Sequence, residues 1–182
     1  MVATPEALSK AALSYLARYA APAGHLRRLL LARVARSAKA YGTDPEAGAQ
    51  AVETIIVRLT DRGLLDDGAY ARARARSLFR RGASGYAIRA RLAQKGVAAA
   101  DIDAAIAGLA EEAAQPELAA ALAFARRRRL GPFRPAERRA GHRDRDLASL
   151  GRQGFDYALA RRVVDCEDLR ELEAEAGIAG AP

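Results

Sequence analysis

The sequence predicts an all-α protein: tandem repeats of three-helix modules, about nine helices in all, forming an elongated, curved, solenoid-like body. Apolar residues recur every three to four positions along the 182 residues, and runs of β-branched residues are missing. Short phrases recur in one order along the chain, as in repeat proteins. Aromatic residues make up only 5% of the chain, which favours thin, closely packed helices. Because repeat units contact mainly their neighbours, an extended arc is expected.

The first module is predicted over residues 1–65. Thr4 and Pro5 are typical of a helix start, so a helix is expected from about residue 5 to 19. Pro22 and Gly24 should separate it from a strongly basic helix over about 25–39. A long internal loop, 37–48, is expected before a third helix capped by Thr43 or Asp44. The apolar face of that third helix consists of Val52, Ile55, Ile56 and Leu59.

The second module is predicted over residues 66–112, and it begins with the phrase GLLDDGAYARARARSLFRRG. Gly63 should end the preceding helix, and Asp66 should cap a helix over about 67–81. Neighbouring carboxylates at a helix start do not face each other, so capping and the helix dipole account for Asp66 and Asp67 better than acid and base catalysis does. Ser84 should cap the second helix, which ends at Lys95, and Asp101 should begin the third.

The third module is predicted over residues 113–182. The stretch 110–117 is interpreted as a module boundary, with the alternative that Pro116 lies in the first turn of the next helix. A helix ending in Arg126 to Arg129 should be followed by an irregular basic segment, 130–142. Helix is expected again over 145–152 and, after Asp156 as cap, up to Val164. The acidic tail from Asp165 onward is expected to fray.

Two sets of phrases support the internal repeat. SYLAR, AYARA and AFARR place aromatic residues at Tyr15, Tyr70 and Phe124, spaced by 55 and 54 residues. LAQKGV from Leu92 and LGRQGF from Leu150 share leucine, a long polar residue, glycine and an apolar residue. Chance similarity among alanine-rich helices is the alternative explanation. Three anchors in one order favour the repeat.

Composition restricts the class of function. A formal charge of +8 indicates an anionic partner, nucleic acid first and a membrane surface second, with a merely solvated basic surface as the alternative.

The chain lacks a set of residues at metal-ligand spacing, because it has one cysteine, Cys166, and only two histidines, His25 and His142. No cofactor is expected. The histidines stand among arginines, which suits surface contacts. With no catalytic set and no phosphate-cradling loop, the chain is not expected to be an enzyme. Signal-peptide and membrane-spanning patterns are lacking, so a cytosolic protein, monomeric by expectation, is predicted.

The candidate interface is a set of basic side chains. Arg72, Arg76 and Arg80 form a row at i, i+4 and i+8, with no acidic residue at i+4 to balance them. Many cations along one surface favour phosphate contact through counterion release, or docking to an acidic protein groove. The complete set is Arg72, Arg76, Arg80, Arg89, Arg91, Lys95, Arg126, Arg127, Arg128 and Arg129.

The phrases GLLDDGAYARA, RRGASGYAIRARLAQKGV, RRRRLGPF and LGRQGFDYALARRVV resemble the RecX family of bacterial RecA regulators. The resemblance runs from about Leu13 to Asp165 and fits the middle module best. It implies tandem three-helix modules that lie in the groove of the RecA filament on DNA and bridge its protomers. By the same resemblance, docking is expected to suppress strand exchange, ATP hydrolysis and co-protease activity. Only the basic faces of the middle helices carry over, as a contact surface.

Two other functions fit the same composition. A helix-turn-helix regulator also has three short helices, but it reads bases from one recognition helix, whereas here arginine is spread over all three modules. An RNA-binding or ribosome-binding basic protein is the third possibility. Weak, sequence-indifferent DNA binding would accompany docking to a RecA filament.

Overall fold

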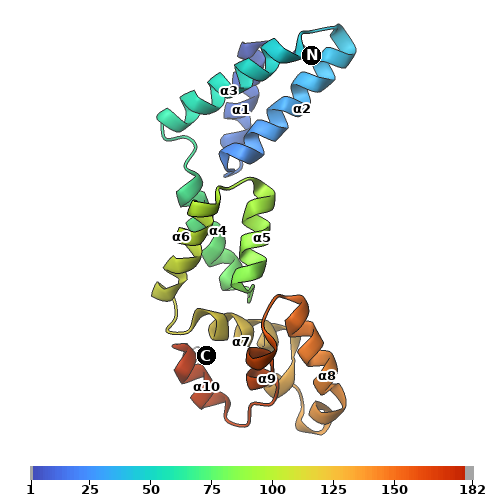
Figure 1. Ribbon diagram of the computed structural model, residues 1–182, viewed down its shortest axis with the longest axis vertical. Coiled ribbons are helices and arrows are strands. Elements are labelled where there is room, and N and C mark those ends of the chain that lie inside the picture. The colour runs from blue at the N-terminus through green and yellow to red at the C-terminus, as the bar shows by residue number, and fades with distance from the viewer. Residues whose placement is uncertain (1, 179–182) are drawn as a thin grey trace. The chain divides into compact units, whose positions relative to one another are not determined.

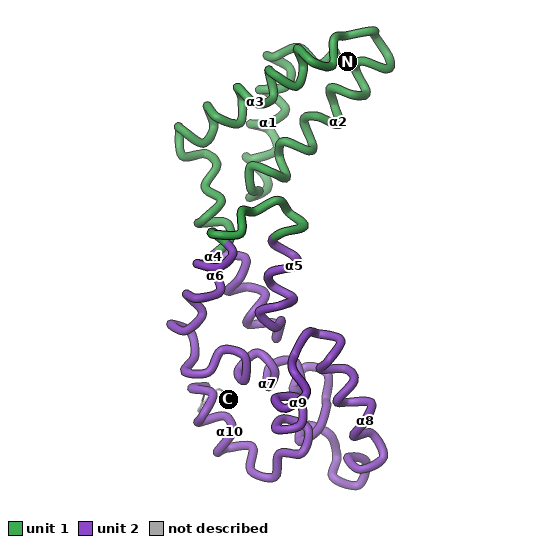
Figure 2. Tube along the Cα trace, viewed as in Figure 1, with its two compact units in different colours: residues 1–71, 93–101 green, residues 72–92, 102–182 purple. Residues whose placement is uncertain are grey.

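A computed structural model describes residues 2–178, and within that range ten α-helices and two short 3-10 helices account for the regular structure, without strands (Figure 1). The all-α fold is therefore confirmed, with one helix more than the nine expected. Two compact units are present, residues 1–71 with 93–101 and residues 72–92 with 102–182 (Figure 2). The division passes through the helices of the predicted middle module, and each unit is described separately.

In the first unit, α1 (Pro5–Leu16), α2 (Ala23–Tyr41) and α3 (Pro45–Asp61) pack on one another. Their buried faces form one apolar core. Its members are Leu8, Ala12, Leu26, Leu30, Val34, Val52, Ile55, Ile56, Leu59 and Leu65. The four residues predicted for the face of α3 all belong to this core, as helical periodicity requires.

The predicted loop over 37–48 is wrong. Helix α2 continues to Tyr41, Gly42 ends it in the left-handed conformation, and α3 begins at Pro45. Ser37 is buried inside α2, where its hydroxyl meets the backbone N–H of Ala3 and the Thr43 hydroxyl. The hydroxyl of Ser37, a residue type that favours loops, thus has its hydrogen bonds made by Ala3 and Thr43, and the local sequence pattern does not reveal these partners. Gly24, expected to break the chain, lies in the first turn of α2.

Helices α4 (Asp67–Phe79), α5 (Gly85–Lys95) and α6 (Ala99–Ala107) follow. Asp66 caps α4 as predicted, since its Oδ1 accepts a hydrogen bond from the Ala69 N–H over 2.7 Å. The Ser84 hydroxyl likewise accepts from the Ala87 N–H at the start of α5. Helix α6 begins two residues before the predicted Asp101, which lies in its first turn. A 3-10 helix, η1 (Gly108–Glu111), continues it.

The rest of the second unit consists of α7 (Pro116–Arg128), η2 (Gly131–Phe133), α8 (Ala136–Arg152), α9 (Tyr157–Val164) and α10 (Leu169–Ala176). Pro116 is the first residue of α7, so the alternative for that proline is the correct one. The irregular segment predicted over 130–142 is wrong from residue 136, because α8 begins there and Gly141 lies within it.

The predicted fraying of the tail is also wrong for the part that the structure describes. Asp168 caps α10, and this helix packs against α7 with Leu172 and Ala176 buried. The Arg162 guanidinium binds the Glu175 carboxylate over 2.6 Å, and the Gln115 amide donates to the same carboxylate over 2.9 Å. Residues 179–182 of the predicted tail lie outside the described residues.

Candidate interface for an anionic partner

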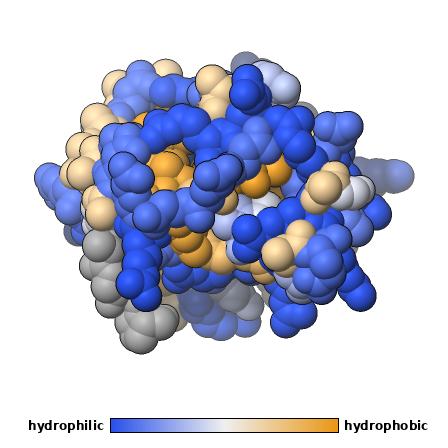
Figure 3. Space-filling view, turned by 90° about the horizontal axis from the view of Figure 1, so that it is seen from below, coloured by the Kyte–Doolittle hydropathy of each residue, from blue (hydrophilic) through white to orange (hydrophobic). Residues whose placement is uncertain are grey.

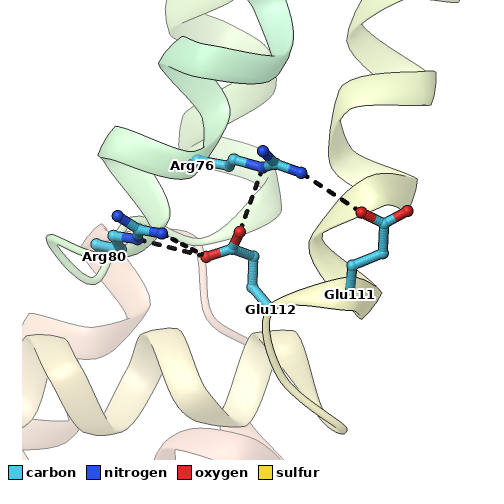
Figure 4. Close-up of polar contacts among 4 residues, drawn as sticks. All are labelled: Arg76, Arg80, Glu111 and Glu112. Atoms are coloured by element: carbon cyan, nitrogen blue, oxygen red, sulfur yellow. Dashed lines mark hydrogen bonds and ion pairs between the residues drawn. The ribbon is translucent and has the colours of Figure 1, made fainter.

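The row of Arg72 and Arg76 on α4 and Arg80 in the turn after it is partly neutralised, contrary to the expectation that no acidic residue balances it. Arg76 Nε lies 3.2 Å from Glu112 Oε1, and Arg76 Nη2 lies 3.4 Å from Glu111 Oε2. Arg80 Nη2 lies 3.0 Å from Glu112 Oε2 (Figure 4). The two carboxylates come from the end of η1 and the residue after it. They lie more than 30 positions along the chain from the arginines, so a search at i+4 does not find them.

Two other predicted cations are also paired. Arg89 Nη2 on α5 lies 2.5 Å from Asp103 Oδ1 on α6. Arg126, in the last turn of α7, binds Glu173 on α10. The tail helix, which the sequence did not predict, supplies that partner. These exposed pairs stabilise the fold by roughly 0 to 1 kcal/mol each, but they lower the charge available to a ligand.

The remaining predicted cations keep their charge uncompensated. Among residues 2–178, no carboxylate forms an ion pair with Arg72, Arg91, Lys95, Arg127, Arg128 or Arg129. All six side chains are exposed. The structure therefore divides the ten predicted residues into six unpaired and four paired cations.

Arg91 and Arg127 line a surface hollow together with two arginines that sequence reasoning missed, Arg74 and Arg81. The hollow has a volume of about 250 Å³, and Gln153 completes its polar lining. No described carboxylate forms an ion pair with any of these four arginines. Arg74 and Arg81 are seven residues apart, which would place them on one side of the helix predicted over 67–81, although α4 ends at Phe79. The row at Arg72, Arg76 and Arg80 has the more regular i, i+4 spacing, so the sequence favoured it over this pair.

The hollow has a fixed frame. Gly82, in the left-handed conformation, lies so close to α7 that a Cβ atom would come within 2.4 Å of the Phe124 nitrogen. The Ser84 hydroxyl donates a hydrogen bond to the Gln153 carbonyl over 2.5 Å. The Arg127 guanidinium lies over the Phe124 ring, 5.9 Å from its centroid. Arginines from α4, the turn after it, α5 and α7 are thereby held around one opening.

The histidines differ from the sequence expectation. His25 is half-buried, and its Nε2 lies 3.1 Å from the Tyr15 hydroxyl, so it is not a free surface contact. Burial lowers the pKa of His25, and the charges of Lys95 and Arg28 lower it further. His142 Nδ1 lies 2.9 Å from the Arg138 carbonyl oxygen. Both rings have local partners instead of facing an open site.

Other kinds of site find no support in the part of the chain that the structure describes. Residues 2–178 hold no cluster of three or more His, Cys, Asp or Glu side chains that could bind a metal ion. No described helix is both long and apolar enough to cross a membrane. Cys166 is partly buried, and burial raises the pKa of its thiol, followed in effect by the charge of Asp168. Hydrophilic residues dominate the face shown in Figure 3, with hydrophobic residues gathered in a recess.

Comparison with known proteins assigns the chain to a family. Residues 66–106 match the model of the second three-helix domain of RecX. A regulatory protein RecX from Myxococcus xanthus is 41% identical over 89% of this chain and 86% of its own length. One from Halorhodospira halophila is 37% identical over 91% of each chain.

A solved structure adds a likeness in fold. A crystal structure of regulatory protein RecX superimposes with a TM-score of 0.60, covering 90% of this chain and 72% of that chain at 23% identity. The matched region and the helical modules agree with the resemblance found in the sequence. The chain belongs to the RecX family of regulatory proteins.

Proposed function

We propose that this protein inhibits a RecA recombinase by docking through basic helical faces in the groove of the RecA filament on DNA. Docking would suppress ATP hydrolysis, strand exchange and co-protease activity. The observation that supports this proposal most directly is the set of six unpaired, exposed cations on α4, α5 and α7, and at the end of α7. A filament on DNA presents anionic groups repeatedly, and distributed cations suit such a target better than a single deep site does.

The ion pairs change which residues should matter most. Arg76 and Arg80 already bind Glu111 and Glu112. Moving either side chain to a new anion would require breaking an existing pair, so its net gain is small. The six unpaired cations have no existing ion pair to break: Arg72, Arg91, Lys95, Arg127, Arg128 and Arg129. We assign the main contacts to them and a lesser role to the paired arginines.

The proposal is tested by ATP hydrolysis of the cognate recombinase on single-stranded DNA. Adding the protein should suppress turnover, and the suppression should weaken as salt rises because exposed charges are screened. The variant Arg127→Glu with Arg128→Glu should raise the concentration for half-inhibition by about thirtyfold or more, since each of the two lost contacts is worth on the order of 1 kcal/mol and repulsion adds to it.

A control with the same charge change is Arg58→Glu with Arg62→Glu, two exposed residues at the end of α3 outside the proposed set. Their substitution should leave inhibition within about threefold of the unaltered protein, as expected for surface changes away from a contact. Equal losses in both variants would show that net charge alone matters. Tight, sequence-selective binding to duplex DNA without recombinase would favour a helix-turn-helix regulator instead.

A further inference from the structure

We infer that the hollow lined by Arg74, Arg81, Arg91 and Arg127 binds backbone phosphate groups of single-stranded nucleic acid. This inference concerns direct binding of nucleic acid, without recombinase, and so goes beyond the proposed function. The four arginines come from α4, the turn after α4, α5 and α7. They line a hollow of about 250 Å³, and Gln153 also belongs to its lining.

The distribution of ion pairs along α4 and the turn after it indicates that the arginines of the hollow bind a ligand. Arg76 on α4 and Arg80 in the turn after it are paired with carboxylates, whereas Arg74 on α4 and Arg81 in that turn are not. Four unpaired guanidinium groups around one opening repel one another, and their charge must be balanced by ions from solution. An anionic polymer that enters the hollow displaces those ions, and their release favours binding.

The chemistry of the lining favours phosphate. A guanidinium group presents its N–H donors as a planar fork that matches two oxygens of a phosphate group. A single carboxylate would neutralise only one of four charges. Consecutive phosphates of one strand bring several negative charges in one ligand. The close contact of Gly82 with Phe124 and the hydrogen bond from Ser84 to Gln153 fix the frame, so little ordering is required on binding.

Tyr86 is the reason for choosing a single strand. Its side chain packs against Gly154, the residue after Gln153, yet it is 73% exposed. An exposed aromatic ring next to a cationic lining offers a surface on which an unpaired base can stack. In duplex DNA the bases are already stacked on one another, so the ring would have no base to accept.

The test measures binding of a fluorescein-labelled oligothymidylate by anisotropy, between about 50 and 200 mM salt and without recombinase. Replacing Arg74→Gln and Arg81→Gln together should lower the association constant at least about tenfold. It should also reduce the slope of log association constant against log salt by about 1.4, from about 0.7 for each of two lost phosphate contacts.

The matched control is Arg76→Gln with Arg80→Gln, which likewise removes one arginine from α4 and one from the turn after it. This control should lower affinity by less than about threefold, because those arginines are already paired. A second hollow variant, Arg91→Gln, lies on a different helix and should also reduce the salt slope, by about 0.7. Thermal unfolding of each variant shows whether it remains folded, and Arg91→Gln keeps the test valid if the double variant does not.

Tyr86→Ala separates stacking from charge. It should lower affinity by about fivefold while leaving the salt slope unchanged, because no cation is removed. Equal losses from the hollow variant and its matched control would overturn the inference, since only net charge would then matter. An oligoglutamate peptide of equal charge that binds as tightly as the oligothymidylate, and loses binding equally in the hollow variant, would overturn it in favour of an acidic protein partner.

Discussion

Asp67, the first residue of α4, accepts a hydrogen bond on its Oδ1 from the backbone N–H of Ala23, the first residue of α2, over 2.7 Å. Pro22 precedes α2 and has no side-chain oxygen, so α2 lacks a cap of its own. Asp67 supplies that cap from 44 residues further along the chain. The sequence indicated that Asp67 serves its own helix, and the structure shows that it serves another.

The same relationship recurs at the next junction. Glu117, in the first turn of α7, accepts a hydrogen bond from the backbone N–H of Gly85 at the start of α5, over 2.6 Å. In both cases an acidic residue at the start of a later helix caps α2 or α5, the middle helix of the preceding group of three. The recurrence of one contact in two places supports the tandem arrangement independently of the sequence phrases.

Replacing Asp67→Ala should therefore lower the free energy of unfolding by about 0.5 to 2 kcal/mol, as loss of a helix cap does. Asp67→Asn should lose less, because its amide oxygen still accepts the hydrogen bond. Asp66→Ala should cost a similar amount through the local cap of α4, and neither alanine variant should weaken binding to the partner. Urea denaturation measures the stabilities. An Asp67→Ala variant as stable as the unaltered protein would contradict the capping role.

Asp146 on α8 is buried, with 1% of its surface exposed, and it holds the turn after α7. Its Oδ2 accepts from the Gly131 N–H over 2.9 Å, and its Oδ1 lies 2.8 Å from Arg134 Nη2. Asp146→Ala should lower the free energy of unfolding by about 3 kcal/mol, because it leaves Arg134 and a buried N–H without their partner. The comparison is Asp144→Ala on the same helix, whose side chain is 97% exposed and which should change stability by about 0.5 kcal/mol or less. Similar melting temperatures for the two variants would disprove this role.

Local chemistry made most helix starts predictable. Thr4, Asp44, Asp66, Ser84 and Asp156 all cap the helices for which they were predicted, because each accepts a hydrogen bond from an N–H two or three residues later. Such a signal is complete within four residues. The helices over 136–142 and 169–176 were missed because glycine, proline and acidic residues are tolerated there by contacts with distant segments.

The pattern shared by LAQKGV and LGRQGF proved less specific than it looked. It also occurs as LTDRGL at the end of α3 and as LFRRGA after α4, and in all four places the glycine has positive φ: Gly63, Gly82, Gly96 and Gly154. The pattern is thus the signature of a helix C-terminus.

The ion pairs of the arginines could not be predicted from local sequence, because the fold alone brings their acidic partners close. These partners are Glu111, Glu112, Asp103 and Glu173.

The docking of α10 gives a further prediction, because a frayed tail and a packed helix behave differently in hydrogen exchange. Backbone amides in the second half of α10 should exchange at least about a hundredfold more slowly than unfolded amides, as expected for a helix with a buried face. Leu172→Ala should remove most of that protection by creating a cavity against α7, while Leu13→Ala, at a residue 50% exposed, should not affect it. Unprotected amides in the unaltered protein would show that the tail does not dock.

The lowered pKa of His25 predicts how stability depends on pH. The unfolded chain takes up a proton near the ordinary value of 6.5, whereas the folded protein keeps the ring neutral to lower pH because of burial and the charges of Lys95 and Arg28. The unfolded state therefore binds more protons just below pH 6.5, so the free energy of unfolding falls as the pH decreases and levels off below the folded pKa. The slope cannot exceed about 1.4 kcal/mol per pH unit for one group. Urea denaturation at pH values from about 7.5 to 5.5 tests this dependence. Three carboxyl groups also have lowered pKa values, those of Glu53, Asp165 and Glu175, but they change the free energy of unfolding only at lower pH. His25→Gln should remove this dependence of stability on pH, whereas the control His142→Gln should keep it. If the stability of the unaltered protein instead rises on acidification, the folded state favours the charged His25 ring and the prediction is wrong.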